Sequence, residues 1–149
     1  MTHDLILATV HHWALLLLLT TLATEFALLR QPPSADWVRT LARVDQAYGV
    51  TAVLLLAAGF GRVFWGAKGA GFYLDNPVFW GKVAVFVGMG LLSIVPTLRY
   101  PRWLRRFKTE GRLPTEAQVD STRRWVGWQL LLFVALPLLA AMMARGIGL

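Results

Sequence analysis

The sequence contains no cysteine among its 149 residues, and only 15% of its residues are charged. Without cysteine the chain cannot form disulfides, thiolate metal sites or iron–sulfur clusters, so any redox chemistry has to come from a bound cofactor. The charged fraction is well below the value of about a quarter that is typical of soluble domains. Together with a mean hydropathy of +0.54, it indicates an integral membrane protein.

Long apolar runs take the place of the amphipathic pattern of a soluble fold. A membrane helix needs roughly 20 apolar residues, and four runs approach this length: 5–29, 47–64, 78–98 and 125–143. The first run lacks the basic n-region and the small-residue cleavage site of a signal peptide. We therefore predict an all-α fold, a four-helix bundle in the membrane, formed by a single domain over residues 1–149.

Basic residues are distributed unevenly between the connections of these spans. Eleven of the fifteen lie in the first and third connections, and only Arg62, Lys68, Lys82 and Arg145 lie elsewhere. By the positive-inside rule, both termini and the connection 65–77 face outward. This distribution accounts for the net charge of +7. The expected partner of the basic residues is anionic lipid at the inner face of the bilayer, not nucleic acid.

Several residues predict where helices begin, bend or lie on the surface. Ser34 and Asn76 are typical N-cap residues for the second and third spans. Pro137 is expected to kink the last span. In the long inner connection, Trp103 and Phe107 share one helical face among arginines, which predicts a short interfacial helix.

Two of the three histidines, His11 and His12, are adjacent within the first span. Ionisable groups inside a membrane are costly unless they face protein, water or a ligand, so they are candidates for function. His11 and Glu25 are fourteen residues apart and share a helical face, whereas His12 is rotated by about 100°. We therefore expect His11, ahead of His12, to face the interior of the bundle.

Three further residues lie at depths that match the histidine pair. Lys82 and Met89 share one stripe of the third span, and Arg62 ends the second span at the predicted outer surface. A histidine below two cations suits haem b, because histidine binds iron axially and cations pair with the propionates. His11 and His12 are thus the candidate metal ligands. Alternatively, the two cations only reach toward the lipid headgroups, and Met89 only packs.

A second polar group is predicted at the inner side. Glu25 lies near the level of Arg43, Asp45 and Arg99, so we expect two ion pairs that hold the inner helix ends together. A proton route from Glu25 toward His11 is the alternative.

Several stretches resemble a known family. The histidine pair, LARVDQAYG (41–49), NPVFWGK (76–82) and GLLSIVPTLRYPRW (90–103) resemble a bacterial inner-membrane family, domain of unknown function 2214, over nearly the whole chain. The resemblance implies a multi-pass protein of the bacterial inner membrane.

In size and number of spans, the chain is also similar to HemJ-type protoporphyrinogen oxidases and CopD-type copper-resistance proteins. HemJ-type proteins have a histidine in the first span and a lysine in the third, which His11 or His12 and Lys82 match. That similarity implies a haem b ligand and a cation that faces the porphyrin. The aromatic and arginine pattern that follows the HemJ histidine is replaced here by Glu25 and Arg30, so oxidase activity is not implied.

Three functions remain open from the sequence. The leading hypothesis is a haem- or porphyrin-binding protein that transfers electrons in the membrane, with a quinone as candidate redox partner. The others are a non-enzymatic assembly factor or structural subunit, and a metal-handling protein similar to transporters. Adjacent histidines on a helix cannot bind opposite faces of one iron. Either the iron has one histidine ligand, or a second chain supplies another across a homodimer interface.

Overall fold

The computed structural model describes residues 2–148, and in this range it contains helices and turns but no strand. Four helical segments are long and apolar enough to cross a membrane. The prediction of an all-α, four-span fold is therefore confirmed. The helices in chain order are α1 (Thr2–Leu28), α2 (Ala35–Trp65), α3 (Gly69–Leu74), α4 (Pro77–Glu110), α5 (Glu116–Phe133) and α6 (Ala135–Ala144).

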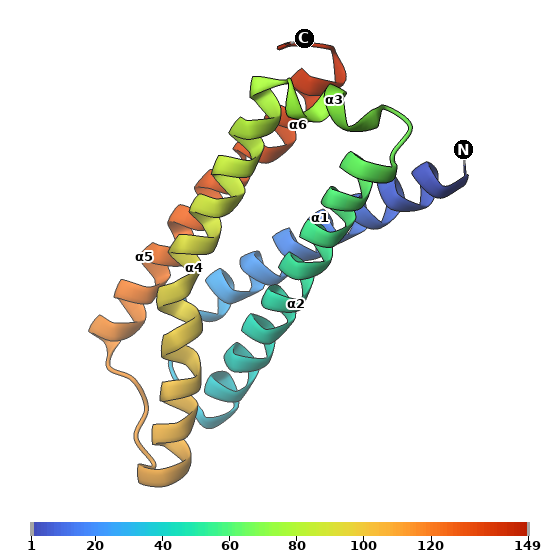
Figure 1. The fold of residues 1–149 in the computed structure, drawn as a ribbon. Helices are drawn as coiled ribbons and strands as arrows, with labels where there is room; N and C mark the ends of the chain where they lie inside the picture. Colours follow the sequence, from blue (N-terminus) through green and yellow to red (C-terminus); the bar gives the residue numbers. More distant parts are fainter. Residues whose placement is uncertain (1, 149) are drawn as a thin grey trace.

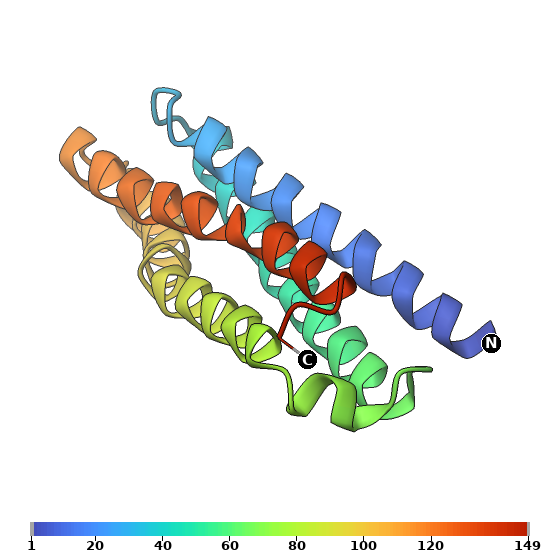
Figure 2. The same cartoon turned by 90° about the horizontal axis from the view of Figure 1, so that it is seen from above.

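The four spans form two antiparallel pairs, α1 with α2 and α4 with α5 and α6 (Figure 1). The start of α1, the end of α6 and the short helix α3 lie at the same end of the bundle, which we call the terminal end (Figure 1). The connections 29–34 and 111–115 lie at the opposite end, which we call the arginine-rich end. The pairs diverge toward the terminal end in both views (Figures 1 and 2). The even number of spans explains why both termini share one side.

Helix ends follow the capping residues of the sequence. The Ser34 hydroxyl accepts a hydrogen bond from the Trp37 backbone N–H at 3.2 Å, and the Asn76 side chain accepts one from Val78 at 2.8 Å. Both bonds satisfy backbone donors that have no partner within the first turn of a helix. The two N-cap predictions are confirmed.

Proline breaks one span and not another. The last span is divided between Phe133 and Ala135, four and two residues before Pro137. Proline has no N–H to donate to the residue four positions earlier, and its ring clashes with that carbonyl, so the predicted kink is confirmed. Helix α4 continues through both Pro96 and Pro101.

The continuation of α4 corrects the prediction of a separate interfacial helix between 99 and 110. These residues form the last turns of α4, which ends at Glu110 before Gly111 in the left-handed conformation. Trp103 is buried and stacks on Trp37 of α2, with the ring centroids 5.9 Å apart. This packing holds the extension against the start of α2, so the helix does not turn along the membrane surface.

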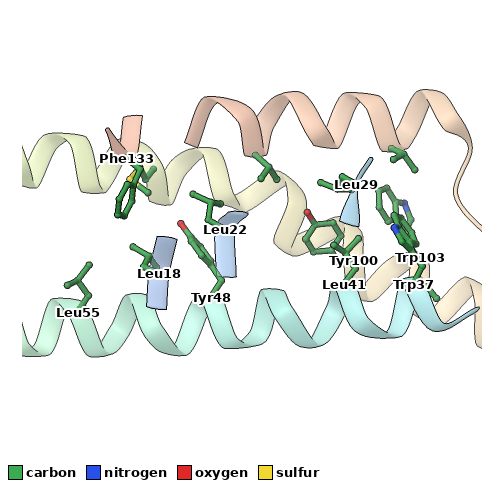
Figure 3. Packing of buried hydrophobic residues seen from close by; sticks show 14 of the residues in the cluster. Leu18, Leu22, Leu29, Trp37, Leu41, Tyr48, Leu55, Tyr100, Trp103 and Phe133 are labelled. Carbon is green, nitrogen blue, oxygen red and sulfur yellow. The ribbon is translucent and has the colours of Figure 1, made fainter. Parts of the chain in front are cut away.

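The core is concentrated between the two pairs, away from the terminal end. Leu18 and Leu22 of α1 are fully buried and pack among side chains of α2, α4 and α5 (Figure 3). The outward surface is apolar, and large side chains such as Val53, Leu91 and Leu131 are exposed. Soluble monomers rarely expose large apolar patches, so this surface is suited to lipid.

Candidate functional site

His11 of α1 packs directly on the backbone of α2 at Gly59. A Cβ atom at position 59 would lie 3.3 Å from His11 Cε1 and 3.6 Å from Nδ1. A larger residue would therefore push the imidazole away, and glycine allows the ring to lie against the neighbouring helix. The prediction that His11 is the histidine facing the bundle is confirmed.

The two ring nitrogens of His11 have different surroundings. Nδ1 is on the edge that faces α2, is buried and makes no hydrogen bond, although the Leu55 carbonyl lies close to the ring. Nε2 lies farther from α2. A histidine that binds a metal usually directs its second nitrogen toward a carbonyl or carboxylate; the acceptor near His11 is the Leu55 carbonyl, but Nδ1 makes no hydrogen bond to it.

Two cations from other helices lie close to His11. Lys82 of α4 and Arg62 of α2 are both within electrostatic range of the imidazole and of each other. Arg62 Nε is buried without a hydrogen-bond partner. Within residues 2–148, neither cation forms an ion pair with a carboxylate. Neither cation is therefore neutralised by an ion pair within the described residues.

The other two residues predicted for this site do not face it, although the His12 ring lies edge-on to His11 with the ring centroids 6.2 Å apart. His12 is exposed on the outside of α1, and its Nδ1 is hydrogen-bonded to the Ala8 carbonyl at 2.6 Å. Met89 is 1% exposed and belongs to the hydrophobic core. The described residues contain no group of three or more histidine or carboxylate side chains that could hold a metal ion. His11 is therefore the predicted site histidine that lies between α1 and α2.

A second polar cluster lies deeper in the bundle, toward the arginine-rich end. Tyr100 donates a hydrogen bond to Glu25 Oε2 at 3.3 Å, and Thr97 donates one to Asp45 Oδ1 at 2.8 Å. Glu25 is 2% exposed and Asp45 is 7% exposed. The two carboxyl groups are within electrostatic range of each other and of the buried Tyr48. We call Glu25, Asp45, Thr97 and Tyr100 the carboxyl network.

The carboxyl network corrects the predicted ion pairs. Among residues 2–148 the only ion pairs lie on the surface, so neither Glu25 nor Asp45 is paired with Arg43 or Arg99. The Arg99 guanidinium instead donates to the hydroxyls of two α5 residues, Ser121 and Thr122. Arg99 precedes Tyr100 by one residue and is rotated by about 100° from it, toward α5. Arg43 is exposed.

The comparison with protein families gives one match. Residues 3–148 match the family described as "Predicted membrane protein (DUF2214)". The chain belongs to this family. No curated protein and no solved structure matches it. The similarity to HemJ-type and CopD-type proteins therefore stays a prediction.

For this DUF2214 member, sequence reasoning found both carboxyl groups but not their hydrogen-bond donors. Thr97 and Tyr100 are three residues apart on α4, which places both side chains on one helical face. That spacing, opposite one acidic residue on each of the first two spans, was the signal available. An aromatic hydroxyl among arginines is easily assigned to the membrane interface, and this is why Tyr100 was missed.

Proposed function

We propose that the protein binds haem b or a related porphyrin between its helix pairs near the terminal end. The supporting observation is His11, which packs its Nδ1 edge on α2 while two cations that form no ion pair within residues 2–148 lie within electrostatic range. His11 would be the axial ligand. Arg62 and Lys82 would pair with the two propionates, since charge-assisted hydrogen bonds to carboxylates are the strong ones.

The charges of the residues at this site match those of a porphyrin with two propionates. Such a porphyrin supplies two negative charges, and the site contains two cations, neither of which forms an ion pair with a carboxylate within residues 2–148. When bound, a haem iron supplies one-electron chemistry. The protein's own residues would hold the ring, place the iron at His11 and keep lipid from the propionates. We therefore propose a role in electron transfer within the membrane, with a quinone as partner.

The proposed location is the bacterial inner membrane. Basic side chains cluster at the arginine-rich end, where Arg102, Arg105 and Arg106 are exposed on the last turns of α4. Exposed Lys and Arg near a membrane surface are attracted to anionic lipid headgroups. This end would accordingly face the cytoplasm.

The first test is the absorption spectrum of His11→Ala, purified gently from haem-replete cells. We expect the wild-type protein to show a Soret band and His11→Ala to lose it completely, because no other described side chain at the site can replace the axial ligand. His12→Ala is the matched control, since it removes an adjacent imidazole that is exposed on the outside of the bundle.

Two outcomes would contradict the proposal. A colourless wild-type protein that also fails to take up added haem would show that the haem proposal is wrong. The structural-subunit alternative would then take its place. A Soret band that survives in His11→Ala but disappears in His12→Ala would assign the ligand to the lipid-facing histidine, and therefore to a dimer interface. Size-exclusion chromatography in detergent checks that each variant remains folded.

A further inference from the structure

Within residues 2–148, no cation is ion-paired or hydrogen-bonded to the carboxyl network. Glu25 Oε1 is buried and has no hydrogen-bond partner, while Oε2 has only the Tyr100 hydroxyl. An ionised carboxylate without a cation is very costly in an apolar interior, and such groups are neutralised by taking up a proton or a cation. Two carboxyl groups close together increase that cost.

The groups that face Glu25 from each neighbouring helix are all acidic or neutral. They are Asp45 and Tyr48 from α2 and Tyr100 from α4. Figure 3 shows the Tyr48 side chain reaching from α2 into the interior. The Arg99 guanidinium is within electrostatic range of Tyr100, but it is hydrogen-bonded to Ser121 and Thr122 of α5.

Gln129 of α5 adds an independent observation. It is 1% exposed, and both its amide oxygen and its amide nitrogen lack a hydrogen-bond partner. Val126 and Phe133, three residues before and four after, belong to the same core as Leu18 and Leu22 of α1. Gln129 therefore points into the interior that contains Glu25. Buried polar groups without partners are rare in proteins and mark strain, function or a bound species.

The hydrogen bonds of the network also connect the two helix pairs. Tyr100 and Thr97 both belong to α4, whereas their acceptors belong to α1 and α2. Among the described side chains, no other hydrogen bond joins the first pair to α4, α5 or α6. A change in the protons held by the carboxyl groups would therefore act directly on the contact between the pairs.

We propose that Glu25 and Asp45 form a proton-binding site inside the membrane, in which Glu25 holds a proton at neutral pH and the hydroxyls of Tyr100 and Thr97 orient the two carboxyl groups. The proton sits on the Glu25 carboxyl and gives it the donor that a carboxylate lacks. This proposal does not depend on haem binding, because it uses none of the residues of that site.

The test is labelling of the full-length protein, in detergent or lipid nanodiscs, with dicyclohexylcarbodiimide. This apolar reagent adds the O–H of a protonated carboxylic acid across its N=C bond and does not react with an ionised carboxylate. At neutral pH we expect mass spectrometry to find the adduct on Glu25 and not on the exposed Asp36, Glu110 or Glu116. The label should decrease as the pH rises, and Glu25→Gln should abolish it.

Infrared spectroscopy keeps the test decisive if the reagent cannot reach the site. The wild-type protein should show the C=O band of a buried carboxylic acid, and this band should be lost in Glu25→Gln. If neither the label nor the band is found, Glu25 is ionised and the proposal is wrong. If sodium chloride, but not choline chloride, removes both signals at constant pH, the site binds a metal cation in place of a proton, and the proton assignment is overturned.

Discussion

The two halves of the bundle carry unpaired groups of opposite sign. Toward the terminal end, Arg62 and Lys82 lie near His11 without a carboxylate partner within residues 2–148. Toward the arginine-rich end, Glu25 and Asp45 are buried without a cation. His11 and Glu25 are fourteen residues apart on one helix, which is about 21 Å. The two groups cannot neutralise each other over this distance.

The halves also differ in how their helices are joined. Near the arginine-rich end the pairs are connected by the stacked Trp37 and Trp103 and by two side-chain hydrogen bonds. Toward the terminal end the pairs diverge, and a smaller buried cluster of Val63, Tyr73 and Met143 connects them around α3 (Figure 1). A region with few packing contacts opens at a lower free-energy cost than a packed core. The difference favours ligand entry at the terminal end and a stable, closed network at the other.

The first prediction concerns the orientation of the two halves, and its outcome is all or none. Reporter fusions at either terminus should be active only outside the cytoplasm, and a fusion in the connection 111–115 only inside it. The reason is that eleven of the fifteen basic residues lie toward the arginine-rich end, which the positive-inside rule places in the cytoplasm. A cytoplasmic C-terminus would reverse the comparison and would place the cationic site at the inner membrane surface.

The sequence predicted the fold well because apolar length and capping residues act locally. Ser34, Asn76 and Pro137 each act within one turn of a helix, so their effects needed no knowledge of the neighbouring helices. The contact of His11 with Gly59 and the hydrogen bonds of the carboxyl network depend instead on the neighbouring helices. Whether Glu25 contacts Arg99 or Tyr100 depends on the rotation of α4 about its axis, which is set by packing against α2 and α5.

The next prediction concerns Lys82→Ala, which tests the role of the two cations near His11. If Lys82 pairs with a propionate, its removal should weaken porphyrin binding by about 1.5–3 kcal/mol, or about 10- to 150-fold in Kd, as expected for a hydrogen bond to a charged group. The axial ligand remains, so the Soret band of the saturated protein should persist. Titration of the apoprotein with haem measures both properties.

Lys68→Ala is the matched control for that measurement. Lys68 lies near the same end but is exposed and positioned over the Phe72 ring, 4.1 Å from its centroid. Its loss should leave the Kd unchanged. Equal effects of the two substitutions would mean that only the general positive potential of this end attracts the ligand, and that Lys82 makes no specific contact.

The smallest expected effect is that of Tyr100→Phe in the carboxyl network. The substitution removes the hydroxyl that donates to Glu25 and keeps the buried ring. Hydrogen bonds between membrane helices contribute about 0.6 kcal/mol on average, and soluble examples reach about 1.5 kcal/mol. We expect the substitution to lower the free energy of unfolding in detergent by an amount within this range. Tyr73→Phe is the control, since Tyr73 lies outside the network, in a cluster near α3. Equal losses for both variants would show that the Tyr100 hydroxyl does not stabilise the contact between the helix pairs.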